Sequence, residues 1–192
     1  MTAIRAFIAI ELNNATQKIL GNVIRQLKPL TGDIVRWVPE QNIHITLKFL
    51  GDTSPANLEI LKKIISNEAS RYAPIALKVT NLGAFPNLRR PRVIWAGIEA
   101  PPSLAAIQRS IDTETQRLGY ATEERPFSPH LTLGRLSHNA TPEDIRKIGD
   151  LLVKNSIAIN ASFTANTVTL FRSDLQPSGA MYTPIHVAPL KS

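Results

Sequence analysis

Apolar and polar residues alternate in two short segments that share a motif. Between residues 42 and 50 every second residue is apolar, and this period of two predicts a β-strand with one buried face. The apolar face would carry Ile43, Ile45, Leu47 and Phe49, and the polar face His44, Thr46 and Lys48. The phrase His44-Ile45-Thr46-Leu47 returns as His130-Leu131-Thr132-Leu133, 86 residues later. Each strand would therefore present one histidine and one threonine on the same face.

Apolar residues recur at helical spacing in four other segments. The pattern predicts helices over residues 14–27, 55–70, 103–118 and 142–153. Ser54-Pro55 and Thr141-Pro142 place a capping residue before a proline at the first helical position, and Asp144 completes a capping box with Thr141. Further strands are predicted over residues 4–11, 76–82, 92–98, 156–163, 166–172 and 182–188.

The two histidine strands are followed by similar sequences. A Ser/Thr-Pro helix start comes 11 residues after His44 and 12 residues after His130. A motif, a turn and a capped helix that recur together indicate an internal duplication. Strands and helices mix without regular βαβ spacing, which favours an α+β fold. We therefore expect one domain over residues 1–192, a bilobal pseudo-twofold duplication with two antiparallel sheets, flanking helices and a central cleft.

Composition narrows the choice of partners and compartment. The 192-residue chain has a formal charge of +7 and a pI near 10.0, which favours polyanionic partners. It has no cysteine, so disulfides, thiolate metal sites and a cysteine nucleophile are excluded. The apolar run over residues 4–11 is too short to span a bilayer and is read as a strand. We expect a cytoplasmic monomer with no membrane contact and no protein partner.

Two histidines in one cleft can act as an acid and a base. Their ordinary pKa near 6.5 allows one imidazole to be neutral and another protonated close to neutral pH. In phosphodiester hydrolysis a neutral imidazole takes a proton from water and an imidazolium gives one to the leaving oxygen. Thr46 and Thr132 would bind the phosphate oxygens. Zinc sites need three or four ligands, and neither motif supplies them, so we expect no metal; His138 and His186 are left out of the site.

The extended motifs resemble those of a known superfamily. Residues 44–51, HITLKFLG, and residues 128–135, SPHLTLGR, are similar to the paired His-x-Thr-x motifs of the two-histidine phosphoesterases. In detail they resemble the RNA 2′,3′-cyclic phosphodiesterase branch, also described as LigT-type 2′-5′ RNA ligases. Residues 5–10 and 36–39 extend the resemblance.

The resemblance implies a reaction and a set of roles. Such enzymes open a terminal ribose 2′,3′-cyclic phosphate to a 2′-phosphomonoester without a metal or cofactor. His44 would be the proton donor and His130 the proton acceptor. RNA ends, nucleoside 2′,3′-cyclic phosphates and tRNA halves would be the partners. The same site run in reverse would join 2′-5′ bonds.

Three further features of the site are predicted with less support from the pattern. Arg135 is the phosphate partner expected from the resemblance, although strict alternation turns it away from His130. Lys48 would lie on the same face of its strand as His44, and it is the weaker candidate for binding the phosphate. For stacking on a base the candidates are Trp37, Phe7 and Phe85, with Trp37 the first to test.

Two alternative functions remain open from the sequence. One is a non-catalytic module that binds nucleotides or RNA ends with the same cleft. The other is a phosphodiesterase for another small cyclic phosphate, such as ADP-ribose 1″,2″-cyclic phosphate. The two titratable groups favour catalysis over binding alone, but they do not choose the substrate.

Overall fold

The computed structural model describes residues 3–155, 157–176 and 179–191, which form an α+β fold as predicted. The helices are α1 (Asn14–Thr31), α2 (Pro55–Ala69), α3 (Pro102–Gln116) and α4 (Pro142–Lys154), with 3-10 turns at Gly32–Ile34 (η1) and Glu40–Asn42 (η2). The predicted caps are present. The Ser54 side chain accepts a hydrogen bond from the Asn57 amide, and Thr141 and Asp144 form a capping box at α4.

The strands pair antiparallel in one sheet of nine described strands. Their order is β7-β4-β5-β6-β3-β1-β8-β9, and β2 pairs with β6 beside this path. The strands are β1 (Ile4–Glu11), β2 (Val35–Trp37), β3 (His44–Thr53), β4 (Ile75–Phe85), β5 (Val93–Glu99), β6 (His130–Leu136), β7 (Ala161–Ala165), β8 (Thr167–Gln176) and β9 (Gly179–Pro189). The strand predicted over 156–163 is shorter, and its first residue lies outside the described part. The sequence did not predict β2, because three residues carry no readable period.

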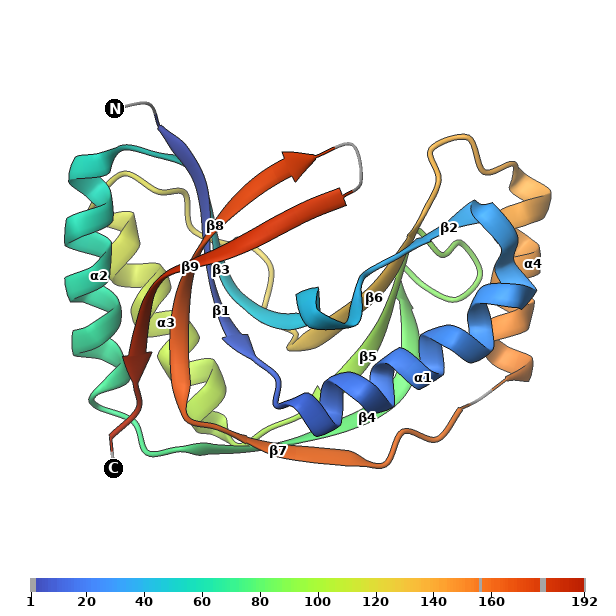
Figure 1. Ribbon diagram of the computed structural model, residues 1–192, viewed down its shortest axis with the longest axis horizontal. Coiled ribbons are helices and arrows are strands. Elements are labelled where there is room, and N and C mark those ends of the chain that lie inside the picture. The colour runs from blue at the N-terminus through green and yellow to red at the C-terminus, as the bar shows by residue number, and fades with distance from the viewer. Residues whose placement is uncertain (1–2, 156, 177–178, 192) are drawn as a thin grey trace.

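The expected two sheets are joined into one, which curls into a V (Figure 1). At its centre β3 and β6 pair only through Ile45 and Leu131. We call β3, β1, β8 and β9 with α2 and α3 the first lobe, and β6, β5, β4, β7 and β2 with α1 and α4 the second lobe. The lobes are not the two halves of the sequence. Helix α1 contacts β2 and β7 of the second lobe, and α3 contacts β3 and α2 of the first.

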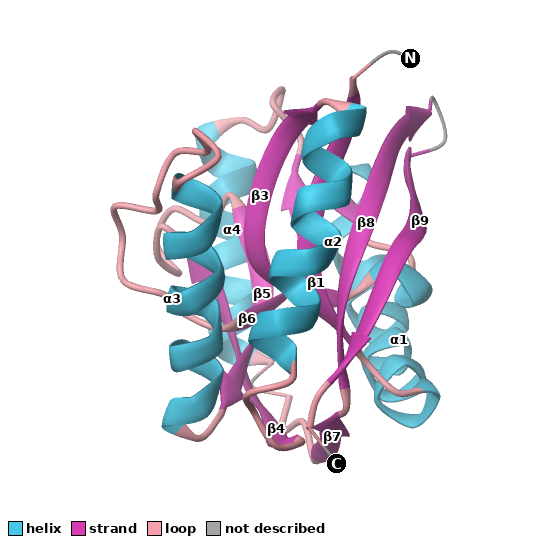
Figure 2. Ribbon diagram, turned by 90° about the vertical axis from the view of Figure 1, so that its left-hand side faces the viewer, coloured by secondary structure: helices cyan, strands magenta, loops and turns pink. Residues whose placement is uncertain are grey.

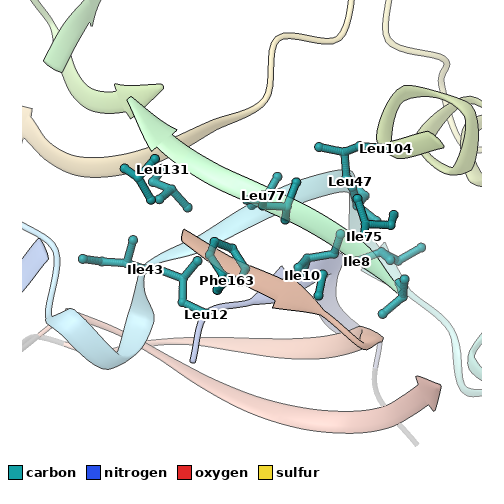
Figure 3. Close-up of a cluster of buried hydrophobic side chains, with 14 of the residues drawn as sticks. Ile8, Ile10, Leu12, Ile43, Leu47, Ile75, Leu77, Leu104, Leu131 and Phe163 are labelled. Atoms are coloured by element: carbon teal, nitrogen blue, oxygen red, sulfur yellow. The ribbon is translucent and has the colours of Figure 1, made fainter. Parts of the chain in front are cut away.

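A single large core crosses the junction of the two lobes. Figure 3 shows Leu131 at one side of this cluster and Leu47 and Leu104 at the other. Helices α2 and α3 lie side by side over the outer face of the first lobe (Figure 2). A smaller cluster, which includes Ile94, Ile148 and Leu152, packs α4 against the strands of the second lobe. The sheet therefore has its helices outside and leaves its inner face open.

Among the described residues, no helix combines the length and the apolar character that a membrane span requires.

Candidate active site

The single bridge between β3 and β6 brings the two histidine motifs together on the inner face of the V. Ile45 is opposite Leu131, so the antiparallel register places His44 level with Thr132 and Thr46 level with His130. All four polar side chains are partly exposed, whereas Ile45 and Leu131 are fully buried. The predicted shared face is confirmed, with each histidine beside the threonine of the other motif.

Both imidazoles are held in the same way. Nδ1 of His44 lies 2.7 Å from the carbonyl oxygen of Asn42, and Nδ1 of His130 lies 2.7 Å from that of Ser128. A carbonyl oxygen only accepts, so Nδ1 carries the hydrogen in both rings. This tautomer leaves Nε2 of each ring free to exchange a proton with a substrate.

Aromatic rings fix the orientation of each imidazole. Phe7 and Tyr182 lie 4.8 Å and 5.4 Å from His44, measured between ring centroids. Phe85 meets His130 edge-on at 4.9 Å, and Trp95 lies 6.4 Å away. Phe7 and Phe85, two of the predicted stacking candidates, are thus beside the histidines. Tyr182 was missed, because β9 carries no motif that connects it with His44.

A bulge in β6 turns Arg135 toward the cleft. On β5, Trp95 pairs with Thr132, but the neighbouring residue Ile94 pairs with Gly134, so Leu133 is left out of the register. An extra residue reverses the alternation beyond it. Arg135 is therefore exposed on the face of His130, which resolves the conflict between the resemblance and strict alternation. Gly134 was the available signal, because an isolated glycine within a strand indicates a bulge.

The same bulge occurs in β3 and overturns two expectations. Ala9 pairs with Thr46 and Ile8 with Lys48, which leaves Leu47 out of the register. Phe49, expected in the core, is 66% exposed on the cleft face. Lys48, a candidate for binding phosphate, is 5% exposed on the opposite face. Its ammonium group binds the Asp112 carboxylate and the Ala121 carbonyl, so it serves packing between β3, α3 and the following loop.

Two titratable side chains of the cleft, His44 and Tyr182, have pKa values shifted from their ordinary values. Burial lowers the pKa of His44, and the nearby charges of His130 and Arg135 lower it further. The hydrogen bond to the Asn42 carbonyl oxygen acts in the opposite direction and raises it. Burial raises the pKa of Tyr182, while Arg135 and Arg5 oppose that rise. Arg135 thus acts on both side chains, and the cleft is positive at this end.

Comparison with known proteins agrees with this geometry. The sequence matches the LigT like phosphoesterase family over residues 10–95 and 98–182, segments that contain both histidine motifs. The chain belongs to the LigT like phosphoesterase family.

Two relatives align over nearly the whole chain. An RNA 2′,3′-cyclic phosphodiesterase of Methanothermobacter thermautotrophicus is 32% identical over 184 residues, which cover 96% of this chain and 97% of the relative. One of Methanocaldococcus jannaschii is 33% identical over 181 residues, covering 94% and 98%. The structure of TT0787 from Thermus thermophilus has the same fold, with a TM-score of 0.82 at 23% identity over 98% of both chains. E. coli LigT complexed with 3′-AMP superposes with a TM-score of 0.76 at 27% identity over 99% of both chains.

The structure does not bring Trp37 into the cleft of this LigT-like phosphoesterase. Trp37 pairs with Gly134 on the outer face of the sheet, and its Nε1–H donates to Thr31 Oγ1 at 3.2 Å. Its place on the inner face is taken by Arg36, which pairs with Arg135 and is exposed. The position of Trp37 gives no support to the expected base stacking.

Among the described residues, no cluster of three or more histidine, cysteine, aspartate or glutamate side chains could hold a metal ion.

Replacing Arg135 with Gln should raise the pKa of His44. The guanidinium charge disfavours the imidazolium form, so its removal favours protonation at a higher pH. The shift is measured by NMR titration of the His44 ring protons. Arg36→Gln is the matched control, because the charge of Arg36 is not among the causes of the His44 shift. Equal pKa values in native and Arg135→Gln proteins would contradict the proximity of the two groups.

Gly134→Ala should destabilise the second lobe. A Cβ at this position would lie 2.8 Å from Val35 Cγ1 and 2.9 Å from Trp37 Cε3, closer than carbon atoms pack. Overpacking of this kind costs about 1–3 kcal/mol. Urea unfolding of the native and substituted proteins measures it. An unchanged midpoint would mean that the Trp37 ring moves aside without cost.

Proposed function

We propose that this protein hydrolyses terminal RNA 2′,3′-cyclic phosphates to 2′-phosphomonoesters by two-histidine acid–base catalysis. The observation that carries the proposal is the pair of imidazoles, each tied through Nδ1 to a carbonyl two residues earlier, on either side of the β3–β6 bridge. Full-length relatives named RNA 2′,3′-cyclic phosphodiesterase support the choice of substrate.

The proposed reaction assigns one proton transfer to each histidine. The cyclic phosphate lies between the two Nε2 atoms, and His130 takes a proton from the attacking water. A new P–O bond forms while the bond from phosphorus to O3′ breaks. His44 gives its proton to O3′, so the phosphate remains on O2′. Each transfer of this kind contributes about 10²–10⁴-fold to the rate.

Thr46, Thr132 and Arg135 are assigned to the phosphate oxygens. Each threonine lies level with the histidine of the other strand, so their hydroxyls flank the same central position. Arg135 supplies a fixed positive charge at one end of that position. Donors that already point at the developing charge stabilise the transition state without reorganisation.

The donor role of His44 depends on the bound substrate. Without a bound substrate, burial and the charges of His130 and Arg135 lower the pKa of His44, which disfavours its protonated form. An anionic phosphate beside the ring stabilises the imidazolium and raises the pKa again. Inorganic phosphate should therefore raise the pKa of His44 in an NMR titration, whereas the same ionic strength of chloride should not. A pKa that phosphate leaves unchanged would count against His44 as the donor.

Turnover of a nucleoside 2′,3′-cyclic phosphate in excess EDTA tests the proposal. We expect a 2′-monophosphate, identified by chromatography against the 2′ and 3′ isomers, at a rate that the chelator does not change. No turnover, with binding retained, would favour a nucleotide-binding module. Turnover of ADP-ribose 1″,2″-cyclic phosphate alone would favour the other cyclic phosphate as substrate.

A further inference from the structure

Asn42 makes hydrogen bonds with two parts of the first lobe. It ends the 3-10 turn η2, and its main-chain carbonyl oxygen lies 2.7 Å from Nδ1 of His44 on β3. Its side-chain nitrogen Nδ2 donates to the carbonyl oxygen of Ala180 on β9, at 2.8 Å. A carbonyl oxygen only accepts, so the orientation of the amide group is fixed by its partner. Asn42 therefore connects the ring of His44 with a residue that lies 138 positions later in the sequence.

The strand that accepts this bond belongs to a hairpin whose end projects beyond β1 (Figure 1). Strand β1 pairs with β8 only as far as Arg172. We call the described residues after it, 173–176 on β8 and 179–182 on β9, the projecting end; they pair only with each other. Leu175 and Met181 in this segment are 73% and 47% exposed, so packing holds its outer part only weakly.

The projecting end carries Tyr182, which packs against His44. The two rings meet edge-on, with 5.4 Å between their centroids, and the ring of Phe7 lies 4.9 Å from that of Tyr182. Among the described residues, the bond from Asn42 is the one side-chain hydrogen bond between the projecting end and another element. Because Ala180 is two residues from Tyr182, this bond limits the movement of the tyrosine ring relative to the imidazole.

The position of the projecting end controls the environment of the His44 ring. Burial is the largest cause of the lowered pKa of His44. Charged and titratable side chains approach this region from strands β1, β6 and β9: Arg5, Glu11, His130, Arg135 and Tyr182. If the projecting end moves away, water reaches the imidazole and its pKa rises toward the ordinary value near 6.5.

The second histidine motif lacks such a connection. Ser128 precedes His130 by two residues, and its carbonyl oxygen lies 2.7 Å from Nδ1 of that ring. Within the part of the chain that the structure describes, the Ser128 side chain makes no hydrogen bond to a distant strand. His130 lines an open pocket of about 670 Å³ instead. This difference agrees with the proposed roles, because the acceptor takes its proton from water and the donor gives its proton to O3′.

We propose that Asn42 is a positioning residue for His44, because its side chain holds the projecting end so that Tyr182 stays against the imidazole whose Nδ1 its carbonyl binds. The consequence for turnover rests on the two-histidine reaction proposed above. Without the amide group the projecting end moves, the imidazole gains freedom, and proton transfer to O3′ slows. Binding of the phosphate is assigned to the threonines and Arg135, so it does not depend on Asn42.

NMR of two variants tests the contact directly. Asn42→Ala removes the amide group and keeps the carbonyl that binds His44. Gln41→Ala is the matched control, because Gln41 is exposed on the same 3-10 turn. Nuclear Overhauser contacts between the ring protons of Tyr182 and His44 should be present in the native protein, lost in Asn42→Ala and retained in Gln41→Ala. Contacts that persist in Asn42→Ala would overturn the inference.

Kinetics with adenosine 2′,3′-cyclic phosphate test the consequence for catalysis. Asn42→Ala should lower kcat by roughly 10- to 100-fold, as expected when a reacting group is displaced by about 1 Å. KM should stay within about threefold, because binding of the substrate is not changed. The pKa of His44 in an NMR titration should rise, and Gln41→Ala should change none of these quantities. An unchanged kcat, or a loss that appears in KM alone, would overturn the inference.

Tyr182→Ala tests whether Asn42 acts through the tyrosine. Alone it should reproduce the fall in kcat and the rise in the pKa of His44. The double variant Asn42→Ala/Tyr182→Ala should then lose no more than either single variant. Losses that multiply in the double variant would overturn the inference, because Asn42 would act independently of Tyr182. A native protein without turnover refutes the proposed function, whereas the Overhauser contacts and the pKa of His44 still decide the role of Asn42.

Discussion

Alanine at His44 or at His130 should each lower turnover of a 2′,3′-cyclic phosphate by about 10²–10⁴-fold, because each substitution removes one proton transfer. The two rings are held alike, through Nδ1 and a backbone carbonyl, so neither is expected to be dispensable. Rates are compared at saturating substrate, where a loss of binding alone would not appear. The 2′-phosphate product should become undetectable on the time scale of native turnover.

His138→Ala is the control for this experiment. His138 is exposed in the turn between β6 and α4, outside the cleft, so native turnover should be retained. The double variant His44→Ala/His130→Ala should lose little more than either single variant, because groups that act as one unit are not additive. Native turnover in either single variant would rule out the two-histidine mechanism. Retained binding with both histidines replaced would show that the cleft still recognises the phosphate.

The largest loss of stability is expected from Lys48→Ala, at about 3–5 kcal/mol. The Lys48 side chain is 4% exposed and the Asp112 side chain 16%. Removal of the ammonium leaves a largely buried carboxylate and the Ala121 carbonyl without their partner. Urea unfolding of the native and substituted proteins gives the difference in the free energy of unfolding.

Two comparisons separate the buried ion pair from simple loss of side-chain volume. Lys62→Ala breaks the exposed pair with Glu59 and should cost no more than about 1 kcal/mol. Lys48→Met combined with Asp112→Leu removes both charges and keeps the volume, so it should recover most of the loss. If Lys48→Ala instead lowered activity and left stability unchanged, Lys48 would act on the substrate. A strand without a bulge would place Lys48 on the face of His44, which is why the sequence suggested that role.

Local sequence patterns predicted most of the elements of this protein. Helical spacing and capping residues gave all four α-helices to within a few residues, because Ser54 and Thr141 cap their helices whatever the tertiary contacts are. The alternation around His44 and His130 gave both central strands. The repeated motif also indicated that the two histidines lie close together, and the bridge between Ile45 and Leu131 brings both motifs to one face of the sheet.

Local sequence patterns could not predict which lobe each helix packs against. The sequence repeats as two halves, yet α1 packs on the second lobe and α3 on the first. An amphipathic helix shows that one face is buried, but it does not identify the surface that buries it. The short strand β2 depends in the same way on its partner β6, which brings Arg36 beside Arg135.

The sequence by itself determined the two histidines, the two threonines and the strands that carry them, because a period of two assigns a face without any partner. Only the tertiary structure decided the faces of the residues beyond Leu47 and Leu133. An extra residue at Leu47 in β3 and at Leu133 in β6 reverses the alternation there, and these shifts exist only in the register with β1 and β5. They move Lys48 into the protein and turn Phe49 and Arg135 toward the cleft. The exposure of Phe49 and the pairing of Arg36 with Arg135 both depend on contacts between strands that are far apart in the sequence.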